Sequence, residues 1–146
     1  MKKKGLIALG LGVGAGILLL SLSGKKDDTP RSMNQLADQQ GKIATYPPAQ
    51  YKIWADALYE SLKSYVLGYF RDDTEQVINI FKKIKNDKDL AELADAFGTR
   101  EFGLTSAFGF SDKKTLAQVL SSEVGTKNLQ AINQALNSNG VTYQYS

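Results

Sequence analysis

The chain has 146 residues, contains neither cysteine nor histidine, and carries a formal net charge of +3. The absence of these two residue types excludes disulfide bonds, Ser-His-Asp and Cys-His catalysis, and metal sites with Cys or His ligands. Lys2, Lys3 and Lys4 account for the whole charge excess, so the residues from Gly5 onward are neutral overall. A nucleic-acid-binding domain normally carries its own basic surplus, and we therefore expect no nucleic-acid partner.

An apolar segment without charged side chains covers residues 5–24. Twenty helical residues, each rising about 1.5 Å, are long enough to cross a hydrocarbon core of about 30 Å. We predict that residues 1–24 form a retained transmembrane anchor, which contacts the bilayer through residues 5–24 and has its N terminus on the inner side. The alternative is a secreted protein whose signal peptide is removed near Gly24, because Ser21-Leu-Ser23 is an imperfect version of a cleavage site.

Four glycines lie at alternate positions within this apolar segment. Gly10 with Gly14, and Gly12 with Gly16, form two overlapping G-x-x-x-G spacings, which let a second helix approach closely in lipid. These four residues are therefore candidates for helix packing in the membrane. Glycine is also frequent in transmembrane helices in general, so ordinary composition is the alternative explanation.

Residues 25–47 are polar and end in a proline pair, which predicts a tether with one short helix around Met33 to Gln40. Residues 48–146 have helical apolar spacing and are predicted to form an all-α bundle of four to five helices. The tail VTYQY alternates but is too short to build a sheet.

Start and stop signals divide this bundle into helices. The predicted helices are one from Pro48 to Gly68, one after the capping box Asp73-Thr-Glu-Gln76, one capped at Asn86 or Asp87 and stopped by Gly98, one from Ser111 or Asp112, and one from Thr126 to Gly140.

The run from Asp72 to Leu136 resembles a single annexin-like repeat. The resemblance is carried by Thr74-Glu75-Gln76 and by the segments VINIFKKI, DLAELADAFG, TLAQVLSSEVG and LQAINQAL. It implies a helical fold. In annexins a glycine-rich loop before the threonine-acid element binds calcium, whereas this chain has GYFRDD there, so we expect no calcium dependence. The order of basic tip, apolar segment and small helical domain is also similar to small membrane proteins in virions of lipid-containing phages.

Acidic residues gather at two predicted helix starts, as Asp72, Asp73 and Glu75 and as Asp87, Asp89 and Glu92. Acidic side chains are expected there because they cap the helix and complement its dipole. We therefore predict no catalytic residue, no metal site and no cofactor. The alternative is a carboxylate-dependent hydrolase of cell-wall glycan, for which Glu60 and Glu101 are the side chains to test.

Phenylalanine and glycine recur together between residues 97 and 110. Phe97 continues the spacing of the helix before it and is predicted to be buried. We predict that Phe102 and Phe110 are exposed partner-binding residues, with Arg100 and Glu101 as their polar rim. The alternative is that each ring pins a loop onto the core.

Taken together, these features predict a single-pass membrane-anchored structural or interaction protein of a virion membrane or cell envelope. Its helical domain is expected to bind a protein partner or a second copy of the chain.

Overall fold

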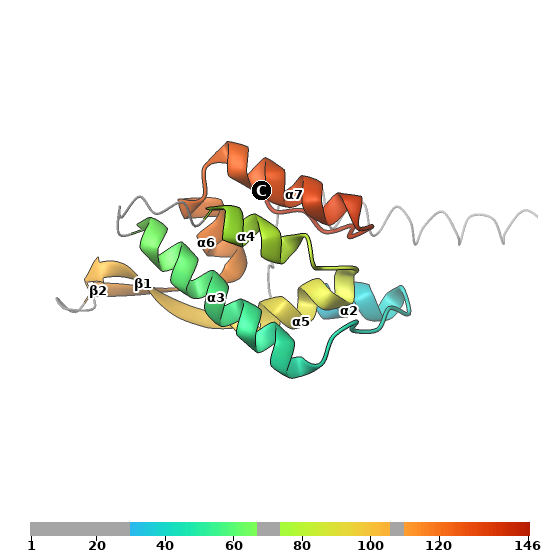
Figure 1. Cartoon of the computed structure of the whole chain (residues 1–146). Helices are drawn as coiled ribbons and strands as arrows, with labels where there is room; N and C mark the ends of the chain where they lie inside the picture. The colour runs from blue at the N-terminus through green and yellow to red at the C-terminus, as the bar shows by residue number, and fades with distance from the viewer. Residues whose placement is uncertain (1–29, 67–73, 106–109) are drawn as a thin grey trace, which may run out of the picture.

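The computed structural model describes residues 30–66, 74–105 and 110–146 (Figure 1). The described elements are α2 (Pro30–Gln39), α3 (Pro48–Val66), α4 (Thr74–Phe81), α5 (Asp87–Phe97), β1 (Thr99–Thr105), β2 (Phe110–Thr115), α6 (Leu116–Glu123) and α7 (Thr126–Ser138). The predominantly helical fold is confirmed. The predicted anchor, with Gly10, Gly12, Gly14 and Gly16, lies outside the described residues. Among the residues that are described, no helix is both long enough and apolar enough to span a membrane.

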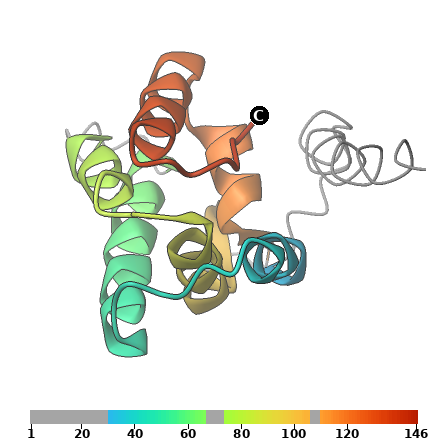
Figure 2. The same ribbon diagram turned by 90° about the vertical axis from the view of Figure 1, so that its right-hand side faces the viewer.

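The helices pack around a common interior. Helix α5 lies between α2 and α3, and α4 packs against both α3 and α7 (Figure 2). Helix α6 follows the hairpin and contacts α3 and α5. Elements from both ends of the described chain therefore contribute to one domain.

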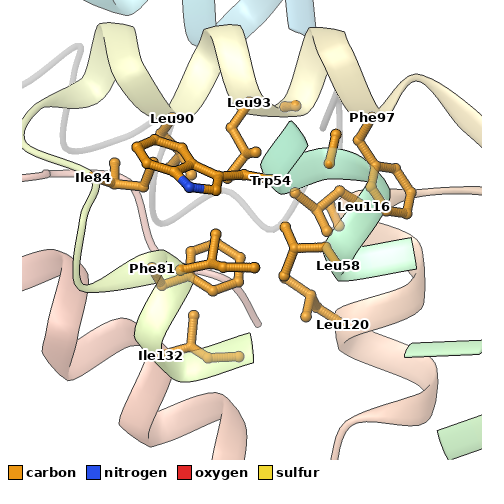
Figure 3. Close-up of a cluster of buried hydrophobic side chains, with 14 of the residues drawn as sticks. Trp54, Leu58, Phe81, Ile84, Leu90, Leu93, Phe97, Leu116, Leu120 and Ile132 are labelled. Carbon is orange, nitrogen blue, oxygen red and sulfur yellow. The ribbon is translucent and has the colours of Figure 1, made fainter. Parts of the chain in front are cut away.

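Large apolar side chains from all six described helices meet in the core, and Figure 3 shows several of them. Helix α3 contributes Trp54 and Leu58, which are four residues apart and so lie on one helical face. The fully buried side chains around them include Phe81, Ile84, Leu90, Leu93, Leu120, Ile132 and Leu136. Each such burial stabilises the fold by roughly 1.5–3 kcal/mol before the entropic cost of ordering the chain is subtracted.

Both ends of α5 follow the signals predicted from the sequence. The side chain of Asn86 caps the helix by accepting a hydrogen bond of 2.9 Å from the backbone N–H of Asp89. Gly98 ends the helix at a φ of +59°, a backbone conformation that side-chain-bearing residues rarely adopt. The predicted boundaries of α5 are therefore confirmed.

A two-stranded hairpin, which was not predicted from the sequence, separates α5 from α6 in this predominantly helical fold. Strands β1 and β2 are antiparallel, with Arg100 opposite Lys114, Glu101 opposite Lys113 and Phe102 opposite Asp112. The opposite charges of Glu101 and Lys113 favour this register, and the two cations Arg100 and Lys114 are each paired elsewhere, with Asp56 and Glu123. The predicted helix start at Ser111 or Asp112 is wrong because these residues lie in β2, and α6 begins after a capping box formed by Thr115 and Gln118.

The segment predicted as a tether contains the expected short helix, seen as α2, but this helix packs onto the domain. Helix α2 buries Met33 and Ala37 against the core and packs along α5. The ammonium of Lys88 reinforces this contact by donating a 2.7 Å hydrogen bond to the side-chain oxygen of Asn34. The segment 40–47, which we call the strap, connects α2 to α3. The domain therefore starts at α2 and not at Pro48. Two apolar side chains, one helical turn apart in a polar sequence, are enough to pack this helix onto the core.

Removing α2 and the strap is expected to destabilise the domain strongly. We predict that the free energy of unfolding of a chain of residues 48–146 is at least about 3 kcal/mol lower than that of a chain of residues 30–146. The physical reason is the loss of two buried apolar side chains and of the strap's hydrogen bonds. Urea unfolding followed by circular dichroism measures the difference. Equal unfolding free energies would show that the two segments contribute nothing to stability.

Candidate functional site

The predicted aromatic contact surface is not formed as expected, because Phe102 is buried. Its side chain is only 3% exposed. The ring stacks on Phe97 at a centroid distance of 6.3 Å and meets Tyr59 edge-on at 5.2 Å. Phe102 lies in a strand, where alternate side chains share a face. A search for apolar neighbours at helical spacing therefore could not show whether its ring is buried. The prediction that Phe102 is an exposed anchor is wrong.

Arg100 lies two residues before Phe102 and is held on the domain by several groups. Its guanidinium forms a 2.6 Å ion pair with Asp56 and lies 5.1 Å from the ring centroid of Tyr59. Its Nε donates a hydrogen bond to the carbonyl oxygen of Phe97 at 3.0 Å. Arg100 therefore fastens the hairpin to α3.

Glu101 and Phe110 are the remaining residues of the predicted contact surface. Glu101 lies between Arg100 and Phe102 and is exposed, as the alternation of a strand requires. Phe110 is the first residue of β2, and its partner-binding role stays a prediction.

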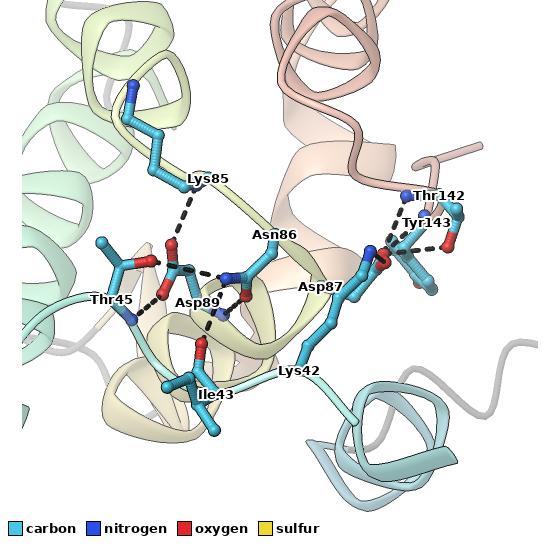
Figure 4. Close-up of polar contacts among 9 residues, drawn as sticks. All are labelled: Lys42, Ile43, Thr45, Lys85, Asn86, Asp87, Asp89, Thr142 and Tyr143. Carbon is cyan, nitrogen blue, oxygen red and sulfur yellow. Dashed lines mark hydrogen bonds and ion pairs between the residues drawn. The ribbon is translucent and has the colours of Figure 1, made fainter. Parts of the chain in front are cut away.

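Two aspartates at the start of α5 are buried and fully engaged (Figure 4). Asp89 is 0% exposed and accepts hydrogen bonds from the backbone N–H of Thr45 at 2.6 Å and of Lys85 at 2.9 Å. The hydroxyl of Tyr51 donates a third bond of 2.6 Å to the same carboxylate. Burial and this hydrogen bond raise the pKa of the Tyr51 hydroxyl. Asp89 therefore joins the strap and α3 to α5.

Asp87 connects α5 to the strap and to the C-terminal segment. It forms a 3.0 Å ion pair with Lys42 in the strap. Its other oxygen accepts hydrogen bonds from the backbone N–H of Thr142 at 2.8 Å and of Tyr143 at 3.2 Å. We call Asp87 and Asp89 the carboxylate clasp. Within the described part of the chain, no group of three or more His, Cys, Asp or Glu side chains could hold a metal ion.

An open groove between α3 and α4 is the strongest candidate for a binding site. It has a volume of about 610 Å³ and is lined by Gln50, Ile53, Trp54, Ala57, Glu75, Gln76, Asn79, Ile80 and Lys83. Trp54 is 7% exposed, whereas Ile53 is 59% exposed. Within the described ranges, the only other large apolar side chain that is exposed is Ile43, in the strap.

The charges of this groove lie toward its two ends. Glu75 is in the first turn of α4, and Lys83 lies just beyond the last residue of that helix. Both side chains are exposed, and neither forms an ion pair with another described residue. The ammonium of Lys83 lies 5.8 Å from the ring centroid of Trp54. The groove thus combines an apolar floor with one acidic and one basic end.

A second hollow of about 440 Å³ lies beside β2 and α6, and its lining is polar and charged. There Lys114 contacts Glu123 at 2.6 Å, and this hydrogen bond lowers the pKa of the Glu123 carboxyl. Neither hollow is lined by Glu60 or Glu101, the carboxylates named for the glycan-hydrolase alternative. The groove between α3 and α4 differs from this hollow because Ile53, Trp54, Ala57 and Ile80 are among its lining residues.

The groove was not predicted from the sequence. Ile53 precedes Trp54 and lies off the apolar face of α3, so a single out-of-pattern isoleucine was the available signal. Comparison of the chain with protein-family models, with curated proteins and with solved structures finds no match.

Proposed function

We propose that this chain is a single-pass membrane-anchored structural protein that presents its helical domain to a protein partner close to a bilayer. A virion membrane or a cell envelope is the setting that fits this layout. The observation that carries the proposal is the charge-free apolar segment 5–24, which ends shortly before the first helix of the domain.

The distance between the anchor and the domain is short. Helix α2 starts at Pro30, so residues 25–29 are the whole connection after Gly24. Five extended residues reach about 18 Å at most. The domain is consequently held near the headgroups.

The packing of the domain also supports a structural role. The clasp holds the strap, because Asp89 accepts a hydrogen bond from the Thr45 backbone and Asp87 pairs with Lys42. The groove between α3 and α4 supplies an apolar surface with charged ends for a partner. These features suit a protein that links a membrane to a protein partner.

Membrane extraction of the full chain tests the anchoring. We expect the protein expressed in bacteria to sediment with membranes, to resist alkaline carbonate and to retain residues 5–24 by intact mass. Leu18→Lys combined with Leu19→Lys should release it, because lysine near the centre of a membrane helix opposes insertion by about 2.5–3.5 kcal/mol per residue. Lys113→Glu is the matched control with an exposed change of charge. A mature species starting near Gly24 would support secretion instead.

A further inference from the structure

We propose that the groove between α3 and α4 is a self-association surface, which docks against the same groove of a second copy across a two-fold axis beside Asn79. The inference specifies the partner in the proposed function and rests on that proposal only in expecting a protein partner. It does not depend on whether residues 5–24 cross a membrane.

The apolar part of the groove is suited to contact with an identical surface. Ile53 projects at 59% exposure beside Trp54, and Ala57 and Ile80 complete the apolar lining. In a two-fold dimer both copies use the same patch. Each Ile53 would then be removed from water against the apolar floor of the other copy, where burial of an isoleucine is favourable.

The charges of the groove select an antiparallel arrangement. Glu75 and Lys83 lie four positions before and four positions after Asn79. When two such segments run antiparallel about Asn79, each Glu75 faces Lys83 of the second copy, and Asn79 faces itself. A parallel arrangement would place Glu75 against Glu75 and Lys83 against Lys83, where like charges repel. The sequence of this segment is therefore electrostatically self-complementary in one orientation.

Site-specific cross-linking of the full chain in detergent tests the proposal. Because the natural chain has no cysteine, Asn79→Cys introduces a single thiol at the proposed axis. Mild oxidation is expected to yield a disulfide-linked dimer. Lys113→Cys, an exposed position on the hairpin, is the matched control and should give at least fivefold less. Equal yields at the two positions would indicate random collision, or association through the apolar segment alone, and would overturn the proposal.

Charge reversal in the Asn79→Cys background gives a sharper test. Glu75→Lys and Lys83→Glu should each reduce the dimer yield at least fivefold, because each places like charges opposite one another. The two changes together in one chain should restore the yield. A mixture of the two single-reversal chains, carrying different tags, should give mainly the mixed dimer.

The pattern of these yields separates the possible outcomes. Circular dichroism melts of all variants confirm that the fold is retained, since both charged side chains are exposed. Yields that are insensitive to reversal, or reversal without rescue by the double change, would overturn the two-fold arrangement. Loss of membrane extraction with retained cross-linking would reject the anchor and leave this inference standing.

Discussion

Replacing Asp89 with alanine is expected to destabilise the domain by about 3–5 kcal/mol. The change removes the acceptor for the backbone N–H groups of Thr45 and Lys85 and for the hydroxyl of Tyr51. Asp89 is 0% exposed, so water cannot readily replace the lost carboxylate oxygens. A domain of this size is stable by only about 5–15 kcal/mol, and the variant would be close to unfolding.

Urea unfolding followed by circular dichroism measures this effect, with Asp95→Ala as the control. Asp95 lies on the same helix but is exposed, so its loss should change the unfolding free energy by less than about 0.5 kcal/mol. Tyr51→Phe leaves the carboxylate with two donors but also removes the acceptor of the Tyr46 N–H, so it should cost about 1–2 kcal/mol, less than Asp89→Ala. If Asp89→Ala unfolded at the same urea concentration as Asp95→Ala, the clasp would not stabilise the fold.

Phe102→Ala is expected to cost about 3–5 kcal/mol, a loss similar to that of Phe97→Ala. Both rings are buried and stack on each other, and Phe102 also contacts Tyr59 on α3. Thermal and urea melts of the two variants give the comparison. Glu101→Ala is the control, because its exposed neighbouring side chain should change stability by less than about 0.5 kcal/mol. A Phe102→Ala variant that melts like the natural protein would instead support the exposed, partner-binding role.

Helices were predictable where local signals decide the structure. The apolar face of α3, the Asn86 cap of α5 and the left-handed Gly98 are all encoded within a few neighbouring residues. The hairpin was missed because its strands are short and charged, and because one buried ring makes no visible alternation. Helix α2 was missed as part of the domain because its sequence is mostly polar and its apolar face is narrow.

The clasp and the groove depend on distant parts of the chain. The carboxylates at the start of α5 look like ordinary capping residues, but Asp89 binds a backbone N–H 44 positions away and Asp87 binds another 55 positions away. Likewise, the groove exists only because α3 and α4 pack side by side. A sequence pattern describes one element at a time. It could therefore identify the individual residues but not the distant segments that they contact.

Asp87 contacts both the strap and the C-terminal segment and thereby couples the opening of these two segments. Because one side chain holds both segments, release of either leaves part of its hydrogen-bonding capacity unfilled in a buried place. The two segments should therefore detach together, as a single cooperative unit formed by the strap and the C-terminal segment. In native-state hydrogen exchange, the amides of Thr45 and Thr142 would then share one opening free energy.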